Sequence, residues 1–175
     1  MGLVASYVRH FQAGLLLPGT SSECVKDDGA IMMFDGRRGF GRRVGGEAMK
    51  MAAERCRDTG VGLLTLKNAH HLGRIGAYGE IAMAEGLISL HFVNVTDHPP
   101  SVAPWGGIES RFVTNPICVA IPGTEETPPT LLDMATSRIA IGKARVAMSK
   151  GDKLDPGMVV DSEGKPTTDP AVMYQ

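Results

Sequence analysis

Two adjacent histidines, His70 and His71, are the residues most suited to chemistry in this sequence. They follow the apolar run 61–66, which predicts a buried strand, and Gly73 comes shortly after them. Side chains at the carboxyl end of a strand lie where ligands bind in α/β sheets. Because the unperturbed pKa of histidine lies near neutrality, the position favours a general acid or base. A hydrogen-bonded structural pair is the alternative, and the spacing does not decide between the two.

The histidines do not indicate a metal site. Adjacent side chains diverge along a backbone, and a zinc site needs further ligands at suitable spacing. Only His91 and His98 lie nearby in the sequence. The three cysteines are widely spaced and form no C-x-x-C pattern, so neither a zinc knuckle nor a disulfide framework is indicated. We therefore predict no metal and a reducing compartment.

Residues 36–45 combine glycines with four arginines between a predicted strand and a predicted helix. A phosphate-binding loop has this placement. However, Gly39, Gly41 and Gly45 have the spacing G-x-G-x-x-x-G, and the next strand ends in Lys67 rather than in the acidic residue that binds a ribose. We favour a solvated basic turn over a conventional Rossmann loop built on Gly39 and Gly41.

A third candidate, the segment 133–137, follows an apolar stretch and precedes a predicted helix that ends near Lys150. Backbone N–H groups at the start of a helix can receive a phosphate or a ribose. Asp133 or Thr136 could equally cap the helix. Both interpretations stay open on the sequence.

The elements that must position these residues follow from hydrophobic periodicity and from turn residues. Val4, Tyr7, Val8, Phe11 and Leu15 share one face of a predicted helix that ends before Pro18. The remaining pattern predicts buried strands at 30–34 and 61–66, helices at 46–57 and about 74–85, a strand at 87–95, two short strands at 117–121 and 130–132 that could pair as a hairpin, and a helix ending near 150. The order 61–95 is typical of a βαβ unit. We predict a single α/β domain over residues 1–175, with a mixed sheet flanked by helices.

Composition excludes several classes of protein. The 175 residues are 43% hydrophobic and carry a formal net charge of -1, which does not fit the basic footprint of a nucleic-acid binder. No apolar run reaches the roughly 20 residues of a membrane span, and residues 1–10 lack the layout of a signal peptide. We predict a cytoplasmic protein with neither nucleic acid nor membrane as a partner.

Several segments, taken together and in order, resemble the malate/L-lactate dehydrogenase family of the non-Rossmann type, which includes ureidoglycolate, sulfolactate and piperideine-2-carboxylate oxidoreductases. The resembling segments span nearly the whole chain and are Tyr7-Val8-Arg9 with Ala13-Gly14-Leu15, Gly60-Val61-Gly62, Asn68-Ala69-His70-His71-Leu72-Gly73 with Gly76-Ala77-Tyr78, Ala103-Pro104-Trp105-Gly106-Gly107, Thr114-Asn115-Pro116, Asp133-Met134-Ala135-Thr136, Gly142-Lys143 and Pro166-Thr167-Thr168-Asp169-Pro170.

The resemblance implies hydride transfer between NAD or NADP and the C2 carbon of a small 2-hydroxy or 2-oxo acid, in a homodimer with an unconventional nicotinamide-binding α/β fold. It makes His71 the catalytic acid/base. The residues that it implies for cofactor binding are His71, Leu72, Gly73, Arg74, Ile75, Thr96, Asp133, Met134 and Ala135. Leu72 stands where the family usually has Phe.

The resemblance also implies an incomplete enzyme. Family members begin upstream with a helical segment and a Ser-His-Gly motif, and they continue beyond the last residue of this chain. The 175 residues therefore resemble the middle part of such an enzyme. A truncated, non-catalytic remnant with weak or no cofactor binding is the alternative hypothesis. The arginine expected to bind the substrate carboxylate is not assigned by the resemblance.

Overall fold

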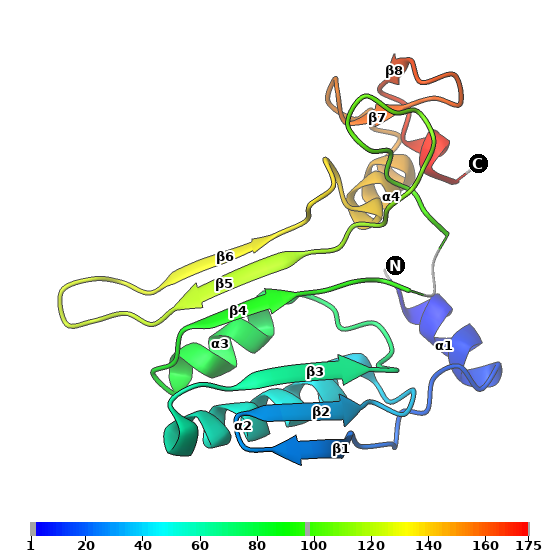
Figure 1. Cartoon of the computed structure of the whole chain (residues 1–175). Helices are drawn as coiled ribbons and strands as arrows, with labels where there is room; N and C mark the ends of the chain where they lie inside the picture. Colours follow the sequence, from blue (N-terminus) through cyan, green and yellow to red (C-terminus); the bar gives the residue numbers. More distant parts are fainter. Residues whose placement is uncertain (1–2, 97–98, 175) are drawn as a thin grey trace. The chain divides into compact units, whose positions relative to one another are not determined.

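The computed structural model describes residues 3–96 and 99–174, and its contacts divide the chain into two compact units. The first unit consists of Met1–Leu90 and Val119–Leu132, and the second consists of His91–Cys118 and Asp133–Gln175. The elements, labelled in Figure 1, are α1 (Val4–Gln12), β1 (Glu23–Asp28), β2 (Ile31–Asp35), α2 (Gly41–Thr59), β3 (Leu63–Lys67), α3 (Gly76–Ala84), β4 (Ser89–Phe92), β5 (Ile117–Ile121), β6 (Thr130–Met134), α4 (Ile141–Lys150), β7 (Val159–Val160), β8 (Pro166–Thr167) and the 3-10 helix η1 (Pro170–Tyr174). That residues 1–175 form a single domain stays a prediction.

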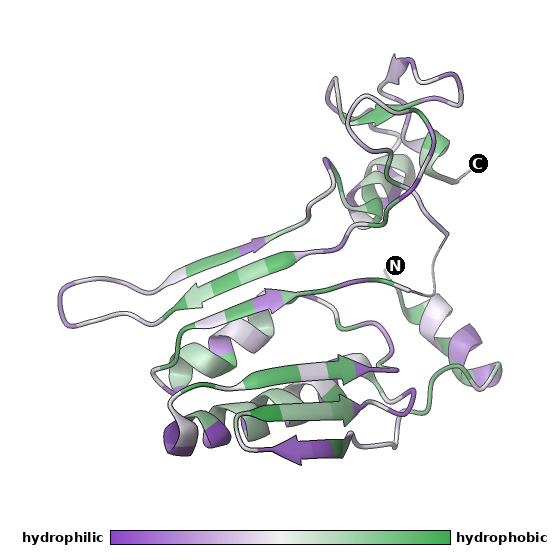
Figure 2. Cartoon of the chain, viewed as in Figure 1, coloured by the Kyte–Doolittle hydropathy of each residue, from purple (hydrophilic) through white to green (hydrophobic). Residues whose placement is uncertain are grey.

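The sheet β1-β2-β3 is mixed, as predicted, because β1 pairs with β2 antiparallel and β2 pairs with β3 parallel. Strand β1 was not predicted from the sequence. Its residues are mostly polar and exposed, whereas β2 and β3 are largely hydrophobic (Figure 2). An edge strand needs little burial, since pairing on one side satisfies its backbone, and hydrophobic periodicity does not detect it.

Helix α2 packs on one face of this sheet and forms the core with it. Met32 and Phe34 of β2 are buried against Ala48 and Ala52 of α2. The alternate side chains of β2 are exposed, so the prediction of a fully buried strand is wrong for one face. A strand covered by a helix on one side buries only every second residue.

The parallel crossover in this unit is β2-α2-β3. The sequence placed a βαβ unit at 61–95 instead, but β4 hydrogen-bonds with β5 in a different sheet. Helix α2 also begins at Gly41 rather than at 46, inside the glycine-rich segment. Its end agrees with the prediction, because Gly60 takes the left-handed conformation, φ 74°, that stops a helix.

Strands β4, β5 and β6 form the second three-stranded sheet in that order, and β5 and β6 run in opposite directions as a hairpin (Figure 1). Helix α4 begins at Ile141, several residues after the predicted start. Within the described residues, no helix is both long enough and apolar enough to cross a membrane.

Candidate active site

A hydrogen bond joins Tyr7 of α1 to His71, which lies in the loop between β3 and α3. The Tyr7 hydroxyl oxygen and the His71 Nδ1 atom are 2.6 Å apart. The Tyr7 ring also packs edge-on against Phe40, with ring centroids 5.6 Å apart. A side chain 64 positions away in the sequence therefore orients the predicted acid/base.

The neighbouring His70 has a different partner. Its Nε2 atom lies 2.8 Å from Nδ1 of His10, also on α1, and its ring packs edge-on against Tyr7. The two adjacent histidines thus both face α1 but contact different side chains. These two hydrogen bonds attach α1 to the loop, and no residue of α1 is fully buried.

The start of α2 lies directly against the backbone of the two histidines. A Cβ atom placed on Gly41 would lie 2.1 Å from the His70 carbonyl oxygen and 2.4 Å from that of His71. Only glycine allows this approach. Gly41 is therefore explained by backbone packing, without a bound phosphate.

Tyr78 of α3 fixes the residue that follows His71. Its hydroxyl donates to the Leu72 carbonyl oxygen at 2.7 Å and also faces the Gly41 carbonyl oxygen at 3.4 Å. Burial raises the pKa of Tyr78 to about 12, although the nearby Arg42 charge acts in the opposite direction. The phenol remains protonated, so it holds the loop as a donor across the neutral pH range.

The segment 72–75 presents a mixed surface. Leu72 and Gly73 are half-buried, Arg74 is exposed and pairs with Glu80 at 2.6 Å, and Ile75 is buried. Gly73 has φ +76°, and a Cβ there would lie 2.6 Å from Nε of Arg42. The absent Cβ lets the Arg42 guanidinium group approach the backbone of Gly73 closely, which places a positive charge beside the predicted cofactor segment.

The basic turn between β2 and α2 is ordered by its own hydrogen bonds. Arg37, Arg38 and Asn68 have positive φ angles although none is glycine. The Arg37 N–H and the Asn68 amide donate to the Asp35 carboxylate and hold its pKa below the ordinary value. These residues, with Leu17 and Thr20, line an open hollow of about 470 Å³. Arg37 and Arg38 are exposed, as predicted for a solvated basic turn.

In the second unit, the predicted cofactor residues flank one segment, Thr114-Asn115-Pro116. The Asn115 side chain accepts a hydrogen bond from the Val95 N–H, next to the exposed Thr96. The Asn115 carbonyl oxygen accepts one from the Thr136 hydroxyl, next to Ala135. Asn115 thus ties the residues after β4 to the residues after β6.

The interpretation of Thr136 as a helix cap is wrong, because α4 starts at Ile141 and no side chain caps it. The Thr136 hydroxyl instead donates to the carbonyl oxygens of Thr114 and Asn115. Asp133 and Met134 are exposed and belong to the end of β6, so they do not lie at a helix start.

His91 of β4 is half-buried, and burial lowers its pKa, while the negative charge of Asp133 acts in the opposite direction. His98, the other histidine weighed as a ligand, lies outside the described residues. Within the described ranges, no group of three His, Cys, Asp or Glu side chains could hold a metal ion.

The structure thus gathers the predicted residues in two places. His71–Ile75 lie together in the first unit, whereas Thr96 and Asp133–Ala135 lie in the second. Sequence reasoning assigned no role to Tyr7, Asn115 or Arg42. Tyr7 and Asn115 occur in segments that carry the family resemblance, and this was the only sequence feature that could have identified them. Arg42 occurs among four arginines, and its position beside Gly73 depends on tertiary packing.

Comparisons with known proteins agree with the sequence resemblance. A family model described as malate/L-lactate dehydrogenase matches residues 1–175. The chain is 46% identical to an L-lactate dehydrogenase of Cupriavidus necator over 157 residues, covering 90% of this chain and 45% of that protein. It is 45% identical to hydroxycarboxylate dehydrogenase B of Escherichia coli K12 over 175 residues, covering 100% of this chain and 48% of that protein.

A solved structure of malate/lactate dehydrogenase type from E. coli matches with a TM-score of 0.92 at 45% identity, covering 99% of this chain and 48% of that one. The chain spans about half the length of the curated relatives that it matches. A match over all 175 residues, together with these identities, shows that the chain belongs to the malate/L-lactate dehydrogenase family.

Proposed function

We propose that this chain supplies the acid/base and part of the cofactor site of an oxidoreductase that transfers hydride between a nicotinamide cofactor and C2 of a small 2-hydroxy or 2-oxo acid. The observation that carries the proposal is the Tyr7–His71 hydrogen bond beside the segment 72–75. The names of the related dehydrogenases support the substrate class.

The chemistry requires a base. Removing a hydride from an alcohol carbon leaves a protonated carbonyl group unless the hydroxyl proton departs in step. A bound nicotinamide supplies the hydride acceptor. His71 takes the hydroxyl proton at Nε2 when its Nδ1–H donates to the Tyr7 oxygen, which lies at 2.6 Å. Tyr7 is thus a positioning residue that orients the ring and, by accepting from Nδ1–H, stabilises the imidazolium ion that forms.

Cofactor binding is assigned to residues of both units. Beside His71, these are Leu72, Gly73, Arg74 and Ile75 in the first unit. In the second unit they are Thr96, Asp133, Met134 and Ala135. The exposure of Arg74, Thr96 and Asp133 and the guanidinium group of Arg42 beside Gly73 support this assignment.

We also propose that the protein is a homodimer in the cytoplasm. The dimer follows from the family resemblance, and the compartment follows from the sequence, whose three cysteines are widely spaced and form no C-x-x-C pattern. Light scattering after size exclusion measures the first property, and fractionation of cells measures the second. A monomer at micromolar concentration would overturn the proposed dimer.

The proposal is tested by titrating NADH and NADPH into the purified chain and by assaying reduction of pyruvate and oxaloacetate. We expect binding of one nicotinamide below about 1 mM, the upper range of ordinary KM values. Absence of binding there would contradict the proposal and favour the non-catalytic remnant, which none of the relatives' names supports.

His71→Ala should lower kcat by about 10²-fold or more, the scale of general acid/base catalysis. His70→Ala is the comparison variant, because His70 is hydrogen-bonded to His10 and contacts Tyr7 through its ring, so it should lower kcat much less than His71→Ala. An unchanged kcat in His71→Ala would refute the role of His71, whatever the cofactor titration shows.

A further inference from the structure

Arg42, in the first turn of α2, carries a positive charge to which the proposed function gives no role. Its side chain is exposed and makes neither a hydrogen bond nor an ion pair with any residue in the ranges 3–96 and 99–174. The adjacent Arg43 contrasts with it, since Arg43 pairs with Glu47 at 2.8 Å and donates to the Ser21 hydroxyl.

Arg42 is nevertheless held near the candidate active site. Its Nε, Nη2 and Cζ atoms all lie within 3.3 Å of the point where a Cβ of Gly73 would be. Its positive charge also acts on the hydroxyl groups of Tyr7 and Tyr78. The guanidinium group therefore lies beside the predicted cofactor segment, and its charge reaches the tyrosine that hydrogen-bonds to His71.

The positive charge of Arg42 at the start of α2 favours the binding of an anion. The N-terminus of a helix carries a partial positive charge, which disfavours a cation there. The first turn of α2 contains no acidic residue to offset Arg42. A cation in such a place gains most when a negatively charged group binds beside it, because a guanidinium forms two parallel hydrogen bonds with a carboxylate.

On the basis of the proposed function, we propose that Arg42 binds the carboxylate of the 2-hydroxy or 2-oxo acid. In such a substrate the carboxylate is bonded to the carbon whose oxygen must reach His71. It therefore lies within a few ångströms of the base, and the Arg42 side chain lies beside Gly73, two residues after His71. A cofactor phosphate is the other anion in the reaction, and the experiment separates the two.

The test measures binding as well as turnover. Oxamate, an unreactive analogue of a 2-oxo acid, is titrated calorimetrically into the wild type and the variants with and without NADH. Arg42→Gln should weaken oxamate binding and raise the KM for pyruvate by roughly 10- to 100-fold, the scale of losing a hydrogen bond to a charged group. NADH affinity should stay within about twofold of wild type.

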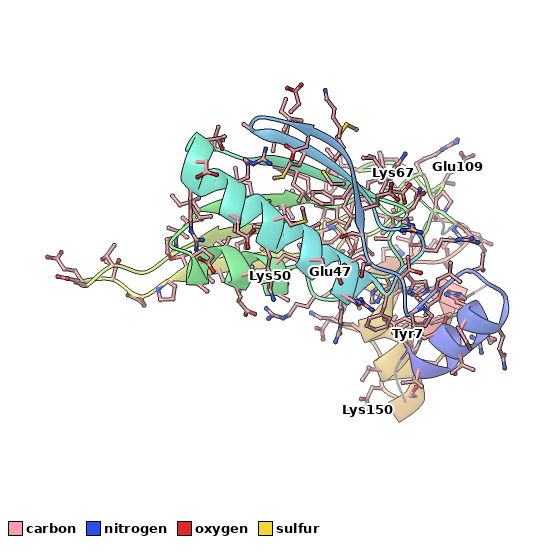
Figure 3. The ribbon with its side chains drawn as sticks, turned by 90° about the horizontal axis from the view of Figure 1, so that it is seen from below. Tyr7, Glu47, Lys50, Lys67, Glu109 and Lys150 are labelled. Carbon is pink, nitrogen blue, oxygen red and sulfur yellow. The ribbon has the colours of Figure 1, made fainter. Side chains whose placement is uncertain are left out.

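Two further variants sharpen the result. Arg42→Lys keeps the positive charge but loses the planar guanidinium group that forms two parallel hydrogen bonds with a carboxylate. Its oxamate affinity should therefore lie between those of wild type and Arg42→Gln. Lys50→Gln removes one positive charge from the same helix two turns further on, where Lys50 is exposed, and should change neither constant (Figure 3). Thermal unfolding should be similar for all three variants, because each replaced side chain is exposed and none makes a hydrogen bond or ion pair with the described residues.

The outcomes are separable. Equal oxamate affinity in wild type and Arg42→Gln, or no oxamate binding by the wild type, overturns the inference about Arg42. Weaker NADH binding with unchanged oxamate binding also overturns the inference and shows that Arg42 binds a cofactor phosphate instead. Oxamate binding that depends on Arg42, in a protein without turnover, supports the inference while contradicting the proposed function.

Discussion

The two regions that carry the predicted site residues are held in different ways. In the first unit, His71 and His70 are fixed by side chains of a separate helix, through the Tyr7–His71 and His10–His70 hydrogen bonds. In the second unit, the positions of Thr96 and Ala135 depend on hydrogen bonds of their chain neighbours to one short segment centred on Asn115.

This difference between the two regions fits two different functions, acid/base catalysis in the first and cofactor binding in the second. An acid/base works only when one ring nitrogen points at its substrate, so the ring itself needs a partner. Residues that line a cofactor need a fixed backbone more than a fixed side chain. Disturbing the first region should therefore affect mainly kcat, and disturbing the second should affect mainly cofactor affinity.

The largest effect is expected from Gly41→Ala. The added Cβ would meet the carbonyl oxygens of His70 and His71, which are backbone atoms and cannot rotate away. We expect a loss of about 3 kcal/mol in unfolding free energy and loss of turnover. Gly46→Ala in the same helix is the control, because a Cβ there meets nothing within 4 Å, and it should be neutral or slightly stabilising. Chemical denaturation measures both, and equal stability of the two variants would contradict the packing.

Asn115→Ala should be next. It removes the acceptor of the half-buried Val95 N–H and places alanine at φ +40°, a conformation that asparagine tolerates better. We expect a cost of about 2 kcal/mol and weaker nicotinamide binding, with kcat changed less than the cofactor Kd. Asn94→Ala removes an exposed amide in the same stretch and serves as control. If Asn115→Ala lowered kcat alone, the proposed division of tasks would be wrong.

Tyr7→Phe should lower kcat by about tenfold, because the variant lacks the hydroxyl group that holds Nδ1 of His71. The cofactor Kd should not change. The pH profile of kcat should shift as well, since the imidazolium ion loses a partner, and a purely structural role would not move it. Tyr174→Phe removes a hydroxyl that donates to the Ile141 carbonyl oxygen in the second unit and is the matched control. A Tyr7→Phe enzyme with wild-type kcat and pH profile would contradict the role of Tyr7 in positioning His71.

The smallest effect concerns pH. Burial lowers the pKa of His91, with Asp133 acting in the opposite direction, so the folded state favours the neutral ring. Below the unfolded pKa of about 6.5, the unfolded chain takes up a proton that the folded chain resists, and stability falls as the pH falls. Above that pH the contribution vanishes. Chemical denaturation at several pH values should show that the unfolding free energy of His91→Gln falls less steeply towards acid pH than that of the wild type. Identical slopes in the two proteins would contradict this role of His91.

Much of the first unit could be predicted from local patterns. The crossover helix and the strand after it follow from periodicity, and Gly60 marks the helix end because a left-handed residue stops the hydrogen-bond ladder. Strand β1 was missed because it is polar, and the start of α2 was misplaced because glycines predict a turn. Gly41 is helical here since the adjoining loop backbone excludes any larger residue.

The candidate site was predictable in the types of residue but not in their partners. A histidine at the end of an apolar strand indicates acid/base chemistry by itself, and the ordered motifs indicate the family. Hydrogen bonds over 64 and 60 positions have no local signal. The role of Thr136 was misjudged for the same reason, because its acceptors lie in a segment about 20 residues earlier.

The amino-acid sequence by itself determined the α/β class, the family and the pair of histidines that could serve as acid/base. Only the tertiary structure decided that His71 is hydrogen-bonded to Tyr7 while His70 is hydrogen-bonded to His10, and that the exposed Arg42 side chain lies beside Gly73. The physical reason is that propensity and periodicity act over a few residues, whereas the partner of a side chain depends on which distant elements pack against it.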